Sequence, residues 1–135
     1  MKEIEMGAAI NAERERRGLR PLAWSENLAA AARRHAADMA AHPGLVHTGS
    51  DGSEAWERIL GAGYPAAQWY EVVGWGYGGE VEPMLGWWLA SPEHMVKVLA
   101  GDVEDVGIGY ATGTGAWGHY WAVDLGTADW RGRYE

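Results

Sequence analysis

The 135-residue sequence contains no cysteine, no phenylalanine and no long apolar run, and each absence excludes a class of protein or site. Without cysteine, the chain has neither a disulfide framework nor a thiol nucleophile, and the redox compartment of the protein is left open. No stretch approaches the roughly 20 apolar residues that span a bilayer. In place of phenylalanine the chain has nine tryptophans, whose indole N–H groups each need a partner or water.

Positive charge is also scarce, since the net charge is −8 at pH 7. This balance argues against a nucleic-acid partner, because the phosphate backbone is bound by a basic face. Residues 1–15 become charged too early for a signal peptide. The protein is therefore either cytoplasmic or the chain begins after a removed export signal. The length predicts a single domain over residues 1–135.

Hydrophobic periodicity predicts an α+β domain whose last strands are antiparallel. In 105–111 and 119–125, apolar residues alternate with glycine or other residues, and the glycine-rich segment 112–118 is typical of a hairpin turn. Another strand is expected around 70–76. Helices covering the sheet are expected at about 3–17, at 25–42, in a short segment ending near Gly61, at 80–90, and in a further turn from Ser91.

Helix-start signals refine these boundaries. Ser25 precedes the second helical pattern and is a suitable N-cap. Asp51 with Glu54 three residues later has the spacing of a capping box, which would start the short third helix. That helix is expected to bury its large apolar residues, Trp56, Ile59 and Leu60.

Three of the five histidines have simple structural interpretations. His35 lies on the apolar stripe of the second helix, which favours a buried structural role. His42 lies near the end of that helix, where a cap or surface position is expected because the partial negative charge favours its protonated form. His119 begins a strand, and its side chain can lie on either face of the sheet.

His47, His94 and Glu71 are the candidates for chemistry. Both histidines lie at a loop or a helix start, where side chains can converge on a cleft. Glu71 lies within an apolar stretch, and a buried carboxylate needs a partner such as histidine. Local motifs give no further help: the chain has no HExxH zinc pattern, no GxSxG elbow, and no lysine after the glycine-rich 74–79 segment to make a phosphate loop.

Short motifs occur in a fixed order along most of the chain. The matching residues are Asn11, Arg14, Gly18, Leu19, Pro21 and Leu22, then His47, Asp51, Gly52, Arg58, Gly63 and Tyr64, then Trp88, Ser91, Pro92 and His94. Together with the closing hairpin, they resemble the CAP superfamily of cysteine-rich secretory, antigen 5 and pathogenesis-related proteins, especially the bacterial SCP-like domains. The resemblance covers about residues 6–126.

The resemblance implies a three-layer α-β-α sandwich with a small antiparallel sheet between helices and a cleft at one end. In many members this cleft holds two histidines and two acids. His47 and His94 match the histidines, and Glu71 matches one acid. The position of the other acid holds Ser91 here, and the asparagine that usually follows the first acid is Val72. Asp51 and Glu93 are the candidates to replace the missing acid.

Two interpretations of these three residues stay open. In one, His47, His94 and Glu71 bind a divalent metal such as Zn²⁺, with weaker binding below about pH 6 because neutral imidazole is required. In the other, Glu71 holds one histidine in a single tautomer and the group is structural.

The resemblance implies a secreted or envelope-associated binding module for a metal, a small apolar ligand or a protein. Five aromatic residues are candidates to form a groove, with Trp117 expected to be exposed: Trp69, Trp75, Tyr77, Trp87 and Trp117. The alternative function is a metal-assisted hydrolase in which His47, Glu71 and His94 are the catalytic candidates and the nucleophile is an activated water. A purely structural domain is the third possibility.

Overall fold

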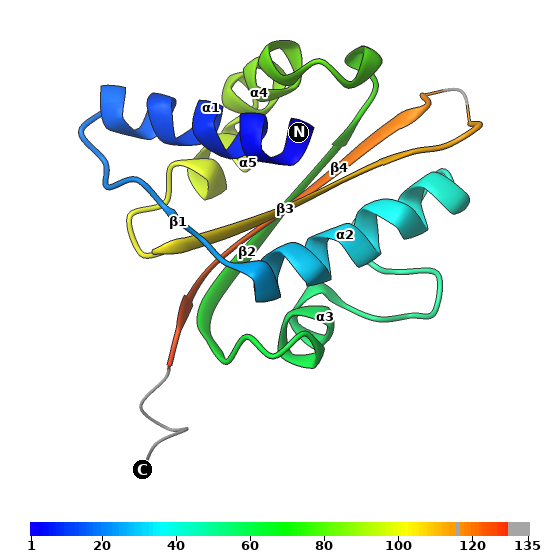
Figure 1. Cartoon of the computed structure of the whole chain (residues 1–135), viewed down its shortest axis with the longest axis horizontal. Helices are drawn as coiled ribbons and strands as arrows, with labels where there is room; N and C mark the ends of the chain where they lie inside the picture. Colours follow the sequence, from blue (N-terminus) through cyan, green and yellow to red (C-terminus); the bar gives the residue numbers. More distant parts are fainter. Residues whose placement is uncertain (116, 130–135) are drawn as a thin grey trace.

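The computed structural model describes residues 1–115 and 117–129, which contain five α-helices, one 3-10 turn and four strands (Figure 1). The helices are α1 Lys2–Arg16, α2 Glu26–Ala41, α3 Ala55–Gly61, α4 Val81–Ala90 and α5 Pro92–Val98, and the 3-10 turn is η1 Tyr77–Gly79. The strands are β1 Ala23–Trp24, β2 Ala66–Trp75, β3 Asp105–Thr112 and β4 His119–Ala128.

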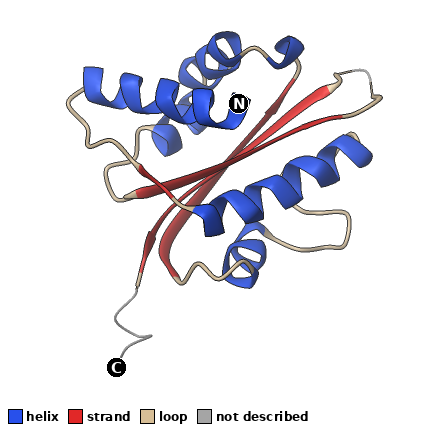
Figure 2. Ribbon diagram, in the orientation of Figure 1, coloured by secondary structure: helices blue, strands red, loops and turns tan. Residues whose placement is uncertain are grey.

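The strands form one sheet in the order β1-β3-β4-β2, with antiparallel pairing except between β1 and β3. Helices α1, α4 and α5 lie on one side of the sheet, and α2 and α3 lie on the other (Figure 2). The predicted three-layer α-β-α sandwich and the closing hairpin are therefore confirmed. The predicted hairpin turn includes Ala116, which lies outside the described residues, as do residues 130–135.

Glycine allows α2 to pack directly on β3. A Cβ atom at Gly107 would overlap the backbone of Ala29, and one at Gly109 would overlap Ala32. The facing side of α2 is rich in buried alanine, so helix and strand backbones approach closely. The start of α2 is as predicted, because Ser25 Oγ accepts a hydrogen bond from Leu28 N at 3.2 Å. The glycine alternation in β3 thus reflects helix packing.

The opposite face of the sheet carries the main apolar core. Met6 and Ile10 of α1 and Trp88 of α4 are fully buried against the strands. The indole Nε1 of Trp88 donates to Val73 O at 3.0 Å. Lys97 Nζ of α5 donates to Glu71 O at 3.2 Å. Side chains of α4 and α5 therefore satisfy carbonyls along β2, an edge strand whose free groups would otherwise invite pairing with other chains.

The third helix differs from the prediction in its start and in its buried face. It begins at Ala55, and its first turn is closed by Glu57, whose Oε1 accepts from Glu54 N at 2.9 Å, so the capping pair is not Asp51 with Glu54. Because three-to-four spacing from Ala55 sets the buried face, the buried residues are Ala55, Arg58 and Ile59. Trp56 and Leu60 are exposed, and only Ile59 of the predicted apolar set is buried.

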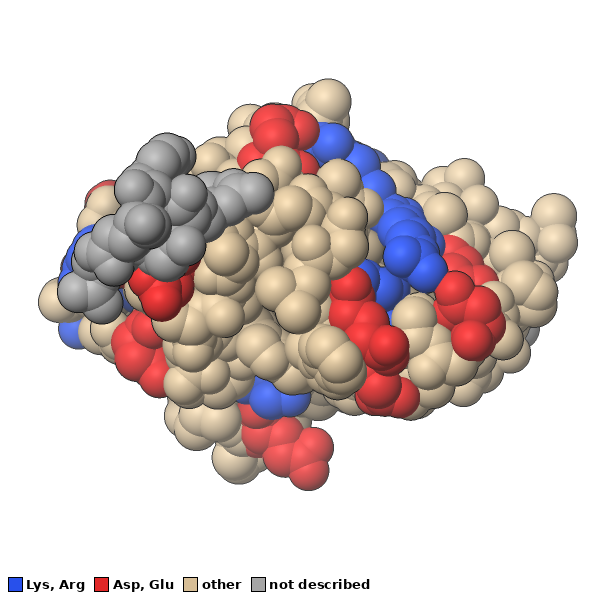
Figure 3. All heavy atoms as spheres, turned by 90° about the horizontal axis from the view of Figure 1, so that it is seen from below, with Lys and Arg blue, Asp and Glu red and all other residues tan. Residues whose placement is uncertain are grey.

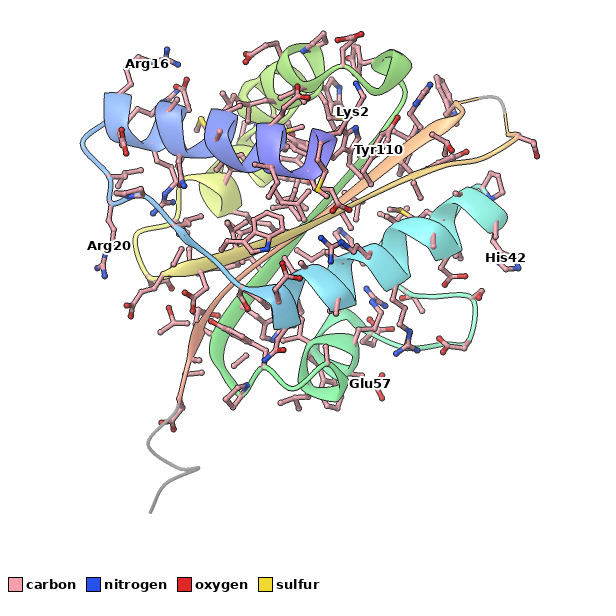
Figure 4. All side chains as sticks on the ribbon, in the orientation of Figure 1. Lys2, Arg16, Arg20, His42, Glu57 and Tyr110 are labelled. Carbon is pink, nitrogen blue, oxygen red and sulfur yellow. The ribbon has the colours of Figure 1, made fainter. Side chains whose placement is uncertain are left out.

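Charged side chains of both signs are interspersed on the face that Figure 3 shows, between wide uncharged areas. Figure 4 shows Arg16, Arg20 and Glu57 pointing away from the body of the molecule. His42 also points outward at the end of α2, where its Nδ1 lies 3.1 Å from Asp38 Oδ1. His42 therefore has the surface position expected for it.

Candidate functional site

A cavity of about 740 Å³ lies at the end of β2 and is bounded by segments from across the chain. Its lining residues come from the loop before α3, the end of β2, η1, α4, α5 and the β3–β4 connection: Val46, His47, Val73, Gly74, Trp75, Gly76, Tyr77, Trp87, Glu93, His94 and Trp117. The structure thus brings His47 and His94, which are remote in sequence, to one cavity. We call it the aromatic cavity.

Four of the five aromatic residues singled out in the sequence line this cavity: Trp75, Tyr77, Trp87 and Trp117. Trp117 is 59% exposed, as expected for a hairpin position. The fifth residue, Trp69, instead lines a smaller cavity of about 300 Å³, which also borders Glu71 and Lys97. His47 borders both cavities and lies between them.

A tight turn supports the aromatic cavity at Tyr77. This residue has φ 55°, the left-handed conformation that non-glycine residues seldom adopt. Two hydrogen bonds lie next to this turn. Lys2 Nζ donates to Gly79 O at 2.8 Å, and the hydroxyl of Tyr110 lies 2.6 Å from His119 Nδ1. Figure 4 shows Lys2 and Tyr110 at this end of the sheet. His119 therefore serves the scaffold of the turn.

His47 is held by a buried ion pair beneath it. Its Nδ1 lies 3.0 Å from Glu71 Oε1, and Arg58 Nη2 donates to both Glu71 oxygens at 3.1 Å. The same Nη2 donates to the His47 carbonyl at 2.8 Å. The Glu71 side chain is 1% exposed and that of His47 is 42% exposed, so the carboxylate is enclosed while the imidazole reaches the cavities.

The ion pair keeps Glu71 ionised despite its burial. Burial alone would raise the pKa of Glu71. The hydrogen bonds of His47 and Asp124 and the charge of Arg58 outweigh it and hold that pKa below its ordinary value. In neutral His47, Nδ1–H then donates to the carboxylate, which leaves the Nε2 lone pair for a ligand.

Asp124 lies beside Glu71 in the β2–β4 register and is fully buried. As an ionised acceptor it would be uncompensated, since no donor among the described residues reaches its oxygens. Burial and the negative charge of Glu71 raise the pKa of Asp124 well above its ordinary value. Asp124 is therefore held in its protonated form beside the ionised Glu71.

His35 closes this buried network from α2. It is completely buried, and its Nε2 donates to Val46 O at 2.5 Å while lying 3.9 Å from Glu71 Oε1. It thereby fixes the backbone just before His47. The structural role expected for His35 is what the structure shows.

His94 faces the aromatic cavity from α5. Its ring lies 4.9 Å from that of Trp87, and its Nδ1 is hydrogen-bonded to Ser91 Oγ at 2.8 Å. Ser91 occupies the N-cap position of α5, but its side chain makes no capping bond and is used by His94 instead. Burial and the positive charge of Lys97 lower the pKa of His94, so its ring is neutral at neutral pH.

The three predicted site residues do not form a closed metal site. Within residues 1–115 and 117–129, no group of three or more His, Asp or Glu side chains is arranged to hold a metal ion. Both Glu71 oxygens are engaged by Arg58. Of the proposed replacement acids, Asp51 pairs with Arg34 at 2.8 Å, whereas Glu93 lines the aromatic cavity together with both histidines without forming a metal-ligand group with them. The donor set is therefore two imidazoles, fewer than the three or four ligands usual for zinc.

Sequence reasoning missed Arg58 and Asp124 as site components. Arg58 was noted only as a motif match, and its burial follows from the start of α3. Asp124 carries the same signal that marked Glu71, a single acid within an apolar strand. Glu71 was expected to pair with a histidine, and this expectation agrees with the structure.

Comparison with known proteins identifies the family of this chain. The model of the cysteine-rich secretory protein family, CAP, matches residues 8–125, which is most of the chain. This chain belongs to the CAP family. No curated protein matches the sequence.

Solved structures share the CAP fold with this chain at low sequence identity. An outer surface protein from Borrelia burgdorferi has a TM-score of 0.85 at 20% identity, covering 95% of this chain and 93% of its own. An extracellular SCP-domain protein from Bacillus anthracis has a TM-score of 0.81 at 18% identity, covering 93% of this chain and 40% of its own. A cysteine-rich secretory protein from Staphylococcus aureus has a TM-score of 0.72 at 16% identity, covering 92% and 37%. The last two proteins are thus much longer than the matched domain.

Proposed function

We propose that this CAP domain is a binding module that takes a ligand with an apolar body into the aromatic cavity. The observation that carries the proposal is the lining: two indoles from β2 and α4, one from the hairpin connection and one phenol surround a space of about 740 Å³. Sites for small organic molecules typically enclose about 300–1,000 Å³ and are mainly apolar with a few polar groups. Exposed aromatic rings gathered at one opening are also unusual unless a ligand or partner covers them.

His47 and His94 supply the polar groups of the proposed site. Each uses Nδ1 within the protein, His47 toward Glu71 and His94 toward Ser91. Each therefore has Nε2 left for the ligand, and its ring orientation is fixed in advance, which lowers the entropy lost on binding.

Binding is better supported than the alternative function, a metal-assisted hydrolase. Such a reaction needs a base that can take a proton from water. Glu71 is enclosed and its oxygens accept hydrogen bonds from Arg58 and His47. Glu71 is therefore not available as that base, and Glu93, the acid that lines the aromatic cavity with both histidines, is not grouped with them as a metal ligand among the described residues.

A fluorescent apolar probe tests the binding proposal. N-phenyl-1-naphthylamine is neutral and becomes fluorescent in apolar surroundings, so we expect saturable binding to the parent protein. Trp87→Ala should weaken it at least about fivefold because part of the wall is lost. Trp56→Ala is the matched control, since Trp56 is similarly exposed but lies on α3 outside the cavity. Unsaturable binding, or an equal effect of both substitutions, would contradict the proposal.

Zinc binding stays a prediction from the family resemblance. The ligands left for the metal in this structure are the imidazoles of His47 and His94. If Zn²⁺ binds through His47 and His94, excess metal should raise the melting temperature at pH 7. The double variant His47→Ala, His94→Ala should lose this shift, while His42→Ala, which removes an exposed histidine, should keep it. A melting curve unchanged by zinc would remove the metal from the function.

We also propose that the domain works outside the cytoplasm. The support is that the relatives named above are described as outer-surface, extracellular or secretory proteins. Of the helices that the structure describes, none has the length and apolar character needed to span a bilayer. Fractionation of the native cells, with the protein detected by antibody, tests the location. Detection only in the cytoplasm would contradict it.

A further inference from the structure

The electrostatic potential inside the aromatic cavity indicates which charge a ligand with an apolar body should carry. Its aromatic rings come from three separate stretches of the chain, residues 75–77, Trp87 and Trp117, so they do not form one stripe. Trp117 lies against Gly76, at a distance where a Cβ atom would meet its ring at 3.5 Å. The faces of indole and phenol rings carry negative potential and attract cations within about 6 Å, with indole the best of them.

The polar groups of the aromatic cavity add to this preference. Glu93 is the one side chain of fixed charge among the described residues that line it, and it is negative. His47 Nδ1 is engaged by Glu71, so Nε2 is the ring nitrogen left for a ligand in the cavity. These groups accept hydrogen bonds or attract positive charge, and an anionic ligand would be repelled by Glu93.

The nearby cations are directed elsewhere. Lys97 borders the smaller cavity and donates to the Glu71 carbonyl. Arg58 is buried beneath His47 and bound to Glu71. Among the described residues that line the aromatic cavity, there is therefore no lysine or arginine to hold an anion.

We propose that the aromatic cavity binds an organic cation of the quaternary ammonium type, with the methylated nitrogen against Trp75, Trp87 and Trp117 and the charge balanced by Glu93. This inference rests on the proposed function and specifies its ligand class. A hydroxyl or amide near the cation would donate to His47 Nε2. The net charge of −8 favours the approach of such a ligand over long range.

A charged and a neutral ligand of the same shape test the proposal. Choline and 3,3-dimethylbutan-1-ol differ in the positive nitrogen, and both carry a hydroxyl. By isothermal titration at matched ionic strength, we expect choline to bind roughly tenfold more tightly, the size of a cation–π contact. Equal affinity, or no choline binding while N-phenyl-1-naphthylamine still binds, would overturn the cation proposal and leave the binding function intact. If choline, 3,3-dimethylbutan-1-ol and N-phenyl-1-naphthylamine all failed to bind, both the cation proposal and the proposed binding function would be overturned.

Matched variants test whether the tighter binding of choline depends on residues of the aromatic cavity. Trp87→Leu keeps apolar bulk but removes the ring, and Glu93→Gln keeps shape but removes charge. Each should lower choline affinity about threefold to tenfold. Trp56→Leu and Glu82→Gln make the same chemical changes outside the aromatic cavity and should have no effect. Equal loss in the Glu93 and Glu82 variants would attribute binding to net charge alone and overturn the assigned site.

The same cation occurs free in solution or as a lipid headgroup, and vesicles separate the two sources. Phosphatidylcholine vesicles that bind the protein and release it on addition of choline indicate the headgroup. Choline binding without vesicle binding indicates a free cation. Phosphatidylglycerol vesicles carry no quaternary nitrogen, so binding to them equal to that of phosphatidylcholine would contradict the proposal.

Discussion

The two sides of His47 differ in what they contain and in how much water reaches them. Beneath it, Arg58, Glu71 and Asp124 form a polar network with almost no exposed surface. Above it, Trp87 and the other rings of the aromatic cavity are partly exposed. The buried network therefore contains the closely paired charges, and the aromatic cavity contains the space for a ligand.

This difference explains why the residues with the most chemical character are not the ones most available to a ligand. The buried carboxylate contributes by holding His47, through which the two regions are connected. A buried charge pair is costly to break but adds little when intact, because desolvation offsets its attraction. We therefore expect substitutions below His47 to change stability and substitutions above it to change binding.

The largest effect is expected from Arg58→Met. This change leaves the Glu71 carboxylate buried without its main partner, and it should lower the free energy of unfolding by about 3–5 kcal/mol at pH 7. Urea-induced unfolding measures it. Arg34→Met is the control, because Arg34 pairs with Asp51 on the surface and should cost at most about 1 kcal/mol. Similar losses in the two variants would show that the buried network is not distinct.

Asp124→Asn should have a smaller effect of the opposite sign. Because the pKa of Asp124 is raised in the folded state, folding must take up a proton once the pH exceeds about 4, where an unfolded aspartate ionises. The contribution of this group is therefore fully present at low pH and is lost as the pH rises toward the folded pKa. The amide needs no proton, so the variant should be more stable by about 1–3 kcal/mol at pH 7 and nearly unchanged at pH 4.

Unfolding in urea across this pH range measures the difference. Glu71 changes stability in the other direction, because its lowered pKa contributes stability above about pH 4 that is lost as the solution becomes more acidic. A difference that does not grow with pH would mean that Asp124 is not the proton carrier.

The sequence allowed the sandwich to be predicted, but only part of the network. His47 and His94 were predicted to share a cleft only because the order of motifs resembles the CAP superfamily. No local spacing in the sequence links two residues so far apart. Asp124 was not singled out, because it occupies one of the alternate positions of 119–125 between the apolar residues. Helices cover both faces of this sheet, so residues on either face of β4 are buried. The burial of Asp124 therefore depends on how the helices pack on the sheet, which the pattern of β4 alone does not give.

The misjudged face of α3 has a different physical cause. Moving the start of a helix leaves its period unchanged but alters which residues lie toward the sheet. With Ala55 as the first residue, Arg58 is turned inward and Trp56 outward. A capping pair of Glu54 with Glu57 was not anticipated, because glutamate is uncommon at that position. The same misplacement concealed Arg58 as a partner for Glu71.

Ser91→Ala tests the rim of the aromatic cavity. It removes the hydrogen bond to His94 Nδ1 and should cost about 0.5–1 kcal/mol, since the bond is only partly buried. The nitrogen chemical shifts of the imidazole should also show mixed tautomers. Ser91→Thr keeps the hydroxyl and serves as the control. An unchanged imidazole spectrum in the alanine variant would mean that Ser91 does not orient the ring.

The smallest stability effect is expected from Trp87→Ala. Trp87 and Trp88 are adjacent in α4, but Trp88 is fully buried and bonded to Val73 O, whereas Trp87 is 44% exposed in the aromatic cavity. Trp88→Ala should cost about 3–5 kcal/mol, and Trp87→Ala about 0.5 kcal/mol or less. Thermal and urea unfolding measure both. If Trp87→Ala destabilised the fold as much as Trp88→Ala, its ring would be part of the core, and its loss of ligand binding would then report unfolding instead of a missing wall.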